Sequence, residues 1–232
     1  AVNSAYCTPG GGRGRRGAGG DIQNAGMNPA AGVVINYYLK EVSDSTKMSI
    51  AIMDKSNKVI KTFSTSSKEN KIEVKKGMNQ FVWDMNHPEA DRVEGLILWN
   101  GFVRGPKAAP GEYTARFRSG ADSADIAFTI LGDPNYATTN AEYEEQVNFL
   151  LTIRDKFSAV MKAMKTIKDV RQQLTDISGR AGKAIPRELK EQMDTINKQL
   201  TAIEEALHQT KAKSGQDVLN FPIRLDDKIA SV

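Results

Sequence analysis

Two hydrophobic patterns divide the sequence, and the first of them has a period of two. Met48, Ile50 and Ile52 alternate with Ser49 and Ala51, which is typical of a strand that buries one face. The same alternation, with turn signals between the runs, predicts short strands at about residues 33–40, 47–53, 58–64, 70–75, 78–84, 95–99, 111–119 and 123–131. Several short strands without helical periodicity between them predict an antiparallel β-sandwich.

From residue 140 onward the apolar spacing becomes helical. A first heptad stripe comprises Leu150, Ile153, Phe157, Val160, Met164, Ile167 and Leu174, and a second comprises Leu189, Met193, Ile196, Leu200, Ile203 and Leu207. We expect Asn140 to cap the first helix, and Gly179 and Gly182 to end it. Pro186 suits the first turn of the next helix. Two stripes joined by a short glycine-containing turn predict an antiparallel helical hairpin.

The C-terminal tail after Ser214 is expected to brace this hairpin. The first predicted helix is the longer one, so its apolar surface near Tyr143 and Leu150 has no partner on the second helix. The tail carries apolar residues of its own, and Phe221 and Leu225 are the expected main anchors. We therefore predict that the tail closes the base of the helical part.

The first 31 residues have the composition of a flexible linker. Residues 10–20 read GGGRGRRGAGG and contain no large apolar side chain, so burial cannot offset the ordering entropy of their glycines. Arginine–glycine tracts also bind RNA, but this tract is short and has no interleaved aromatic residue, which favours the linker. Because the chain starts at Ala1 without a signal-like segment, we expect a piece of a longer protein. The predicted organisation is a linker at 1–31, a sandwich at 32–134 and a hairpin with its brace at 135–232.

Composition and charge narrow the function classes. The 232 residues include 32 Lys and Arg against 28 Asp and Glu, a net charge of +4. Because the folded part has no basic block, we expect no nucleic-acid partner. No apolar run approaches the ~20 residues of a transmembrane helix, so we expect no membrane insertion. The one cysteine, Cys7, excludes an internal disulfide and a cysteine-based zinc site. With only two histidines, no metal site and no cofactor are expected.

One segment has the residue types of a catalytic or metal site. Its candidates are Asp84, His87, Glu89, Asp91 and Glu94, and paired carboxylates are the groups that glycosidases use. The segment also contains a proline and an arginine and lacks a glycine-framed loop, so a solvated connection is favoured over a weak cation site or catalysis. Nucleophile-elbow, phosphate-loop and zinc-protease patterns are absent, so no catalytic residue is predicted. His208, beside the second stripe, is expected to be a surface or seam histidine.

Exposed aromatic residues are the remaining candidates for binding. Trp83 and Trp99 both lie in apolar runs, which favours burial in the core over a platform for sugars. Phe102, Val103 and Arg104 instead lie between two glycines, and aromatic residues and arginine often anchor interfaces. We therefore predict a protein-binding site at these three residues. An ordinary loop whose Phe102 folds back onto the sandwich is the competing interpretation.

Four blocks of the sequence resemble a known family. They are GVVINYYLK (32–40), GMNQFVWDMNHP (77–88), GLILWNGFVRGPKAAPGEYTARF (95–117) and IEEALHQTKAKSGQDVLNFPIRLDDKIA (203–230). In this order they resemble the C-terminal region of bacterial sortilin-like, BNR-repeat β-propeller proteins, which are often labelled glycosyl hydrolases. The resemblance implies an Ig-like sandwich, similar to that of flagellar hook-capping proteins, and then a helical hairpin, both following propeller domains. The Asp-box repeats of those propellers do not occur here, so no functional residue carries over.

We therefore expect an α+β chain, β then α: an Ig-like antiparallel β-sandwich followed by an antiparallel helical hairpin with a C-terminal bracing segment. The expected function is a non-catalytic structural or protein-interaction module of a large secreted protein. Its expected partners are the upstream propeller domains or other subunits of an assembly. From the resemblance alone, the expected location is extracytoplasmic: secreted, periplasmic or at the cell surface. The alternatives are an accessory part of a glycoside hydrolase or peptidase whose active site lies in the propeller, or a carbohydrate-binding module.

Overall fold

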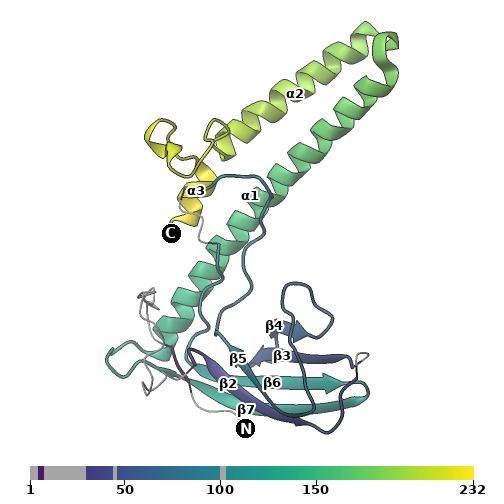
Figure 1. The fold of residues 1–232 in the computed structure, drawn as a ribbon. Helices are drawn as coiled ribbons and strands as arrows, with labels where there is room; N and C mark the ends of the chain where they lie inside the picture. Colours follow the sequence, from purple (N-terminus) through teal and green to yellow (C-terminus); the bar gives the residue numbers. More distant parts are fainter. Residues whose placement is uncertain (1–4, 8–29, 44–45, 100–102) are drawn as a thin grey trace, which may run out of the picture. The chain divides into compact units, whose positions relative to one another are not determined.

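A computed structural model describes residues 5–7, 30–43, 46–99 and 103–232 of the chain. The chain divides into two compact units, whose helices and strands are labelled in Figure 1. The first unit comprises Ala1–Pro88 and Pro106–Asn148, and the second comprises Glu89–Gly105 and Phe149–Val232. The sequence predicted two consecutive blocks. The units instead interleave along the chain, because one connection from the strand region packs with the helices.

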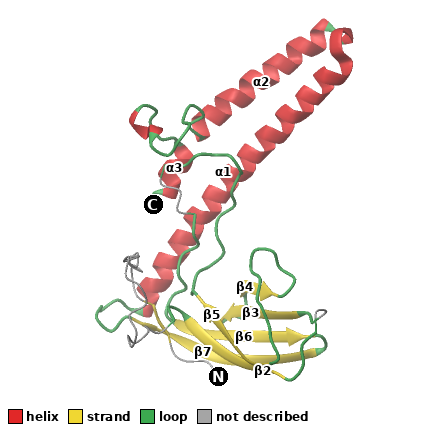
Figure 2. Cartoon of the chain, in the orientation of Figure 1, coloured by secondary structure: helices red, strands yellow, loops and turns green. Residues whose placement is uncertain are grey.

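The first unit contains a mixed five-stranded sheet with the strand order β1–β7–β6–β3–β4. Figure 2 colours the strands yellow. Its strands are β1 (Ala5–Cys7), β3 (Met48–Asp54), β4 (Val59–Ser64), β6 (Gly111–Ser119) and β7 (Asp122–Gly132). Three of the four pairings are antiparallel. The exception is β1, which runs parallel to β7 with Ala5 opposite Ile130.

A second sheet consists of two antiparallel strands, β2 (Val33–Leu39) and β5 (Gly77–Trp83). Alternate residues of both sheets point into one apolar core, which includes Val33, Ile35, Ile50, Ile52, Trp83, Ala115 and Phe128. Trp83 is fully buried, and its ring packs edge-on against the rings of Tyr113 and Phe128. The period-two pattern therefore produces two sheets that share one core.

Six of the eight predicted strands are confirmed, and two are wrong. At 70–75 only Lys71 forms a bridge, to Ser64, and Ile72 is buried in the core from an irregular segment. At 95–99 the apolar residues pack on a helix rather than in a sheet. Strand β1 was not predicted, so the linker prediction is wrong for Ala5–Cys7. Residues 1–4 and 8–29 of that predicted linker lie outside the described residues.

Two long helices, α1 (Asn140–Ala181) and α2 (Arg187–Leu207), are joined by the short helix η1 (Gly182–Ala184). The second unit contains α2 and the part of α1 from Phe149 onward. Gly182 has a φ of 51°, a left-handed conformation that ends α1 as the sequence predicted. Figure 1 shows α2 running back beside the second half of α1. The Arg171 guanidinium on α1 donates to Glu204 on α2 and, at 2.9 Å, to the Thr201 hydroxyl. Arg171, which lies between Ile167 and Leu174 of the first stripe, thus joins the two helices.

The segment Glu89–Gly105 covers part of α1. A buried cluster of four residues joins them: Ala90, Val103, Phe157 and Met161. The backbone N–H of Ala90 donates to the Val103 carbonyl at 2.9 Å, which pairs the two arms of the segment. Leu96 and Leu98 pack against the same cluster. The apolar run that the sequence assigned to a strand therefore reflects contact with a helix.

The tail adds two short helices, η2 (Asp217–Leu219) and α3 (Leu225–Ala230). Ile229 and Ala230 pack on the buried cluster of α1. Tyr143, near which the tail was expected to pack, belongs to the first unit and is buried there beside Gly132. Of the two expected anchors, Phe221 is half-buried. Leu225 is 45% exposed, so the prediction that it anchors the tail is wrong.

A capping box begins α1 one residue before the predicted cap. The Thr139 backbone N–H and hydroxyl donate to the Glu142 carboxylate at 2.7 and 2.9 Å, and the Glu142 N–H donates to the Thr139 hydroxyl at 3.3 Å. The backbone hydrogen bond from Thr139, followed by the hydroxyl bond, lowers the pKa of Glu142. Thr139, not Asn140, is therefore the N-cap.

Replacing Thr139 by alanine is expected to lower the free energy of unfolding by about 0.5–2 kcal/mol.

Because the folded-state pKa of Glu142 is lowered, the stabilisation by its carboxylate is fully present above the ordinary glutamate pKa of about 4.3. It is lost as the pH falls through the lowered pKa of the folded state. Thermal unfolding of the wild type and of Glu142→Gln should therefore differ at neutral pH and converge in acid. Glu145→Gln, outside the capping box, is the control and should show no such convergence.

Candidate functional site

The second unit contains a buried polar cluster where the tail meets the end of α2. His208 directly follows α2, and its Nδ1 lies 2.5 Å from Oδ2 of Asp226 on α3. Both side chains are buried, Asp226 completely. The second oxygen of Asp226 accepts the backbone N–H of Asp227 at 2.8 Å. In turn the Asp227 carboxylate accepts the backbone N–H of Trp99 at 2.8 Å, so three separate parts of the chain are linked.

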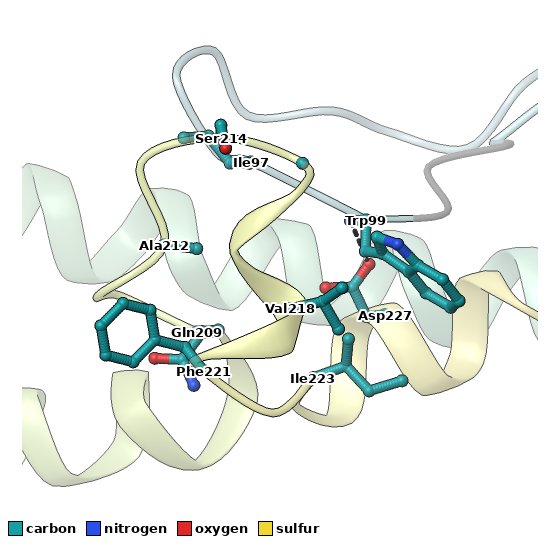
Figure 3. A pocket seen from close by; sticks show the side chains of 10 residues that line it. Ile97, Trp99, Gln209, Ala212, Ser214, Val218, Phe221, Ile223 and Asp227 are labelled. Atoms are coloured by element: carbon teal, nitrogen blue, oxygen red, sulfur yellow. Dashed lines mark hydrogen bonds between the residues drawn. The ribbon is translucent and has the colours of Figure 1, made fainter.

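A small cavity lies beside this cluster. Its lining includes Trp99, Gln209, Ser214, Phe221 and Asp227 (Figure 3). Its volume is about 10 Å³, which is room for about one water molecule. Gln209 donates from Nε2 to the Pro222 carbonyl at 2.8 Å and so holds the tail from the other side. A site of this size excludes a sugar or a peptide.

The His208–Asp226 geometry has the orientation of an acid–base pair, with the carboxylate on Nδ1. A hydrolase of that type also needs a nucleophile on the other ring nitrogen. Among the described residues, the hydrogen-bond partner of the His208 ring is Asp226, and Ser214 on the cavity wall accepts from the Gln216 N–H. The described part of the chain also holds no group of three or more metal-ligating side chains. The hydrogen bond between His208 and Asp226 joins the end of α2 to the tail, and we call this pair the clamp.

The outer face of the β2–β5 sheet is a second candidate site. Three cross-strand pairs form it: Val34 with Val82, Asn36 with Gln80, and Tyr38 with Met78. None of the six is charged, and the Gln80 amide donates to the Asn36 carbonyl oxygen at 3.2 Å. Tyr38 is 64% exposed and Met78 is 61% exposed. We call these six residues the outer sheet face.

The neighbouring Tyr37 shows why Tyr38 is unusual. Tyr37 points toward the core, where its ring lies 5.5 Å from that of Phe117 and burial raises the pKa of its hydroxyl. Strand alternation then directs Tyr38 to the opposite face, where it stands directly across from Met78. A large aromatic and a methionine side by side in solvent are the residue types that binding surfaces use.

The acidic candidates of segment 84–94 do not form one site. Asp84 accepts from the N–H and side-chain amide of Asn86, within the first unit. Glu89 pairs with Arg92 at 3.0 Å, and Asp91 with Lys162 at 3.3 Å, both in the second unit. These carboxylates neutralise nearby cations or shape turns. The predicted solvated connection is wrong for the apolar part of this segment, since Ala90 is buried on α1.

The predicted aromatic and docking residues have mixed outcomes. Trp83 is buried as expected, but Trp99 is 51% exposed, so its predicted burial is wrong. Val103 is buried against α1, which removes it from any docking surface, whereas Arg104 is exposed. Phe102 lies outside the described residues. The ring pairs found in the described part of the chain are all in the first unit, at Tyr37–Phe117, Phe63–Phe81, Trp83–Tyr113, Trp83–Phe128 and Tyr113–Phe128.

The sequence matches no protein-family model, and no curated protein is significantly similar to it.

Proposed function

We propose that this chain is a non-catalytic structural and protein-interaction module. The resemblance stated above suggests the C-terminal region of a secreted bacterial sortilin-like β-propeller protein as its setting. In this proposal the first unit is an Ig-like sandwich, and the second is an antiparallel helical hairpin held by its tail. The partners are then the upstream propeller domains or other subunits of the same assembly.

The observation that carries the proposal is the outer sheet face. Soluble proteins seldom leave adjacent large apolar side chains in solvent unless a partner covers them. Tyr38 and Met78 are both more than half exposed and lie directly opposite each other. The core residues that alternate with them already hold the two strands in place. The exposed pair is therefore free to contribute to binding, as aromatic and methionine side chains do at interface centres.

The proposal predicts a binding defect without a folding defect. Replacing Tyr38 and Met78 together by lysine should weaken binding to the separately expressed upstream propeller by about tenfold or more, because it removes the anchor residues. Calorimetry or biosensor titration measures the affinity, and thermal unfolding checks that the fold is unchanged. Val59→Lys with Tyr136→Lys is the matched control, since those residues are 51% and 57% exposed and lie elsewhere in the first unit.

Equal affinities of the Tyr38/Met78 variant and the control pair would contradict the role of the outer sheet face. Arg104→Ala, tested alone, then asks whether the predicted docking segment carries the binding instead. The purified chain is also expected not to turn over glycoside or peptide substrates. Turnover that disappears in His208→Gln would contradict the non-catalytic assignment and favour the hydrolase alternative.

A further inference from the structure

The single apolar stripe that the sequence predicted on α2 divides into two seams in the structure, and the large apolar side chains are buried or half-buried in only one of them. That seam contains Met193, which is buried, and Leu200 and Leu207, which are half-buried. A second seam, spaced 3, 4, 3, 4 and 3 residues, consists of Leu189, Gln192, Ile196, Gln199, Ile203 and Ala206. Its three large apolar side chains are 40%, 38% and 51% exposed in chain order. We call this second set the outer seam of α2.

The outer seam has the features of an uncompleted coiled coil. Residues spaced alternately by three and four lie along one stripe of a helix and match a heptad repeat. None of the six is charged, although α2 carries eight charged residues. A groove of about 430 Å³, lined by Glu188, Glu191, Gln192, Thr195 and Ile196, lies beside its first half, from residue 188 to residue 196. A further helix that lies on the six seam residues themselves would meet only uncharged side chains.

We propose that the outer seam of α2 is the interface between two copies of this chain, paired antiparallel about a two-fold axis at Ile196. The seam reads almost the same in both directions from that residue. A two-fold axis there places Leu189 opposite Ile203 of the second copy, and Gln192 within one residue of the level of Gln199 of the second copy. Apolar residues then meet apolar residues, and amides meet amides. An interface between two identical surfaces needs this self-complementarity, whereas binding of an unrelated partner does not require it.

The flanking charges select the antiparallel arrangement. Glu191 and Lys198 are both exposed and lie two helical turns apart on the same flank of the seam. The two-fold axis brings Glu191 within about one turn of Lys198 of the second copy, and it does so twice by symmetry. A parallel pair, with the two-fold axis along the helices, would instead place Glu191 and Lys198 of the second copy on opposite flanks of the seam, where they could not pair. In a single copy Glu191 is paired with Arg187 at 2.8 Å. The Glu191 carboxylate therefore has a cation beside it in the monomer as well as in the dimer.

The proposal does not depend on the function proposed above, and the oligomeric state of the full chain tests it directly. We expect a reversible dimer by sedimentation equilibrium at concentrations up to about 100 µM. Ile196→Lys should raise the dimer dissociation constant by about tenfold or more, since it places two lysines at the axis. Leu219→Lys, at a position 89% exposed in the tail, is the control and should dimerise normally. A wild-type chain that stays monomeric over this range overturns the proposal.

A charge exchange tests the direction of the pair. Glu191→Lys alone should weaken the dimer, because two lysines then approach across the axis, and adding Lys198→Glu should restore it. A disulfide supplies an independent measurement. In a Cys7→Ser background, Thr195→Cys lies beside the axis and should cross-link the two copies, whereas Asp194→Cys on the opposite side of α2 should not. A dimer that tolerates Ile196→Lys, or in which both cysteines cross-link equally, would place the interface elsewhere.

Discussion

Replacing His208 by alanine is expected to destabilise the second unit by about 3–5 kcal/mol, because it leaves a completely buried carboxylate without its partner. Asp226 is 0% exposed, and its Oδ2 lies 2.5 Å from the His208 ring. The alanine variant would keep only the Asp227 N–H as a donor to that carboxylate. Urea unfolding followed by circular dichroism at the helix band measures the loss.

Two further variants show whether the loss comes from the pair. Leu225→Ala, next to Asp226 but 45% exposed, should change the unfolding free energy by less than about 1 kcal/mol. In the double variant His208→Leu with Asp226→Leu, an apolar contact replaces both buried polar groups, and much of the stability should return. If His208→Ala and Leu225→Ala unfold alike, the clamp does not hold the tail.

The clamp also shows where sequence reasoning about the tail failed. Hydrophobicity singled out Phe221 and Leu225, because apolar residues in an irregular tail are the usual anchors. Polar groups also hold the tail. Asp226 is hydrogen-bonded to His208, and the Asp227 carboxylate accepts the backbone N–H of Trp99. Two adjacent acids at a short helix look like a solvated surface in the sequence. Only the approach of two distant segments makes them buried.

Local periodicity predicted the strands and helices well, because each pattern reports which side of an element is buried. Six strands and both long helices follow from alternation or heptad spacing alone. What periodicity does not specify is the partner. The run Leu96 to Leu98 is apolar whether it faces a sheet or a helix, and here it packs with the α1 cluster. For the same reason a parallel β1 of three residues gave no signal, since its pairing depends on β7.

The candidate surfaces were missed for a related reason. Tyr38 and Met78 lie in confirmed strands, but alternation treats the outward face as polar by default. Their cross-strand register, Tyr38 opposite Met78, is needed to see them as one surface. The uncharged outer face could have been read from Val34, Asn36 and Tyr38, which alternate with core residues without a single charge.

Gly32→Ala is expected to separate the β2–β5 sheet from the core and thereby remove the outer sheet face. Gly32 has a φ of 145°, and a Cβ at this position would lie 2.2 Å from the carbonyl oxygen of Trp83. That oxygen belongs to the backbone, so no side-chain rotation relieves the clash. Val33 pairs with Trp83 in the first register position of the sheet. Backbone strain and overpacking together predict a loss of about 3 kcal/mol or more.

Gly120→Ala is the matched control for this loss. Gly120 also has a positive φ, of 60°, but a Cβ there would meet no atom within 4 Å, so only the left-handed backbone cost of about 1–2 kcal/mol applies. Hydrogen exchange of the β2 and β5 amides separates the two effects, since Gly32→Ala should expose them and Gly120→Ala should not. In Gly32→Ala, the loss of hydrogen-exchange protection should be accompanied by loss of the binding that depends on Tyr38 and Met78. Equal stability of the two variants would mean that Gly32 tolerates a side chain and that the close approach to Trp83 does not hold the sheet edge.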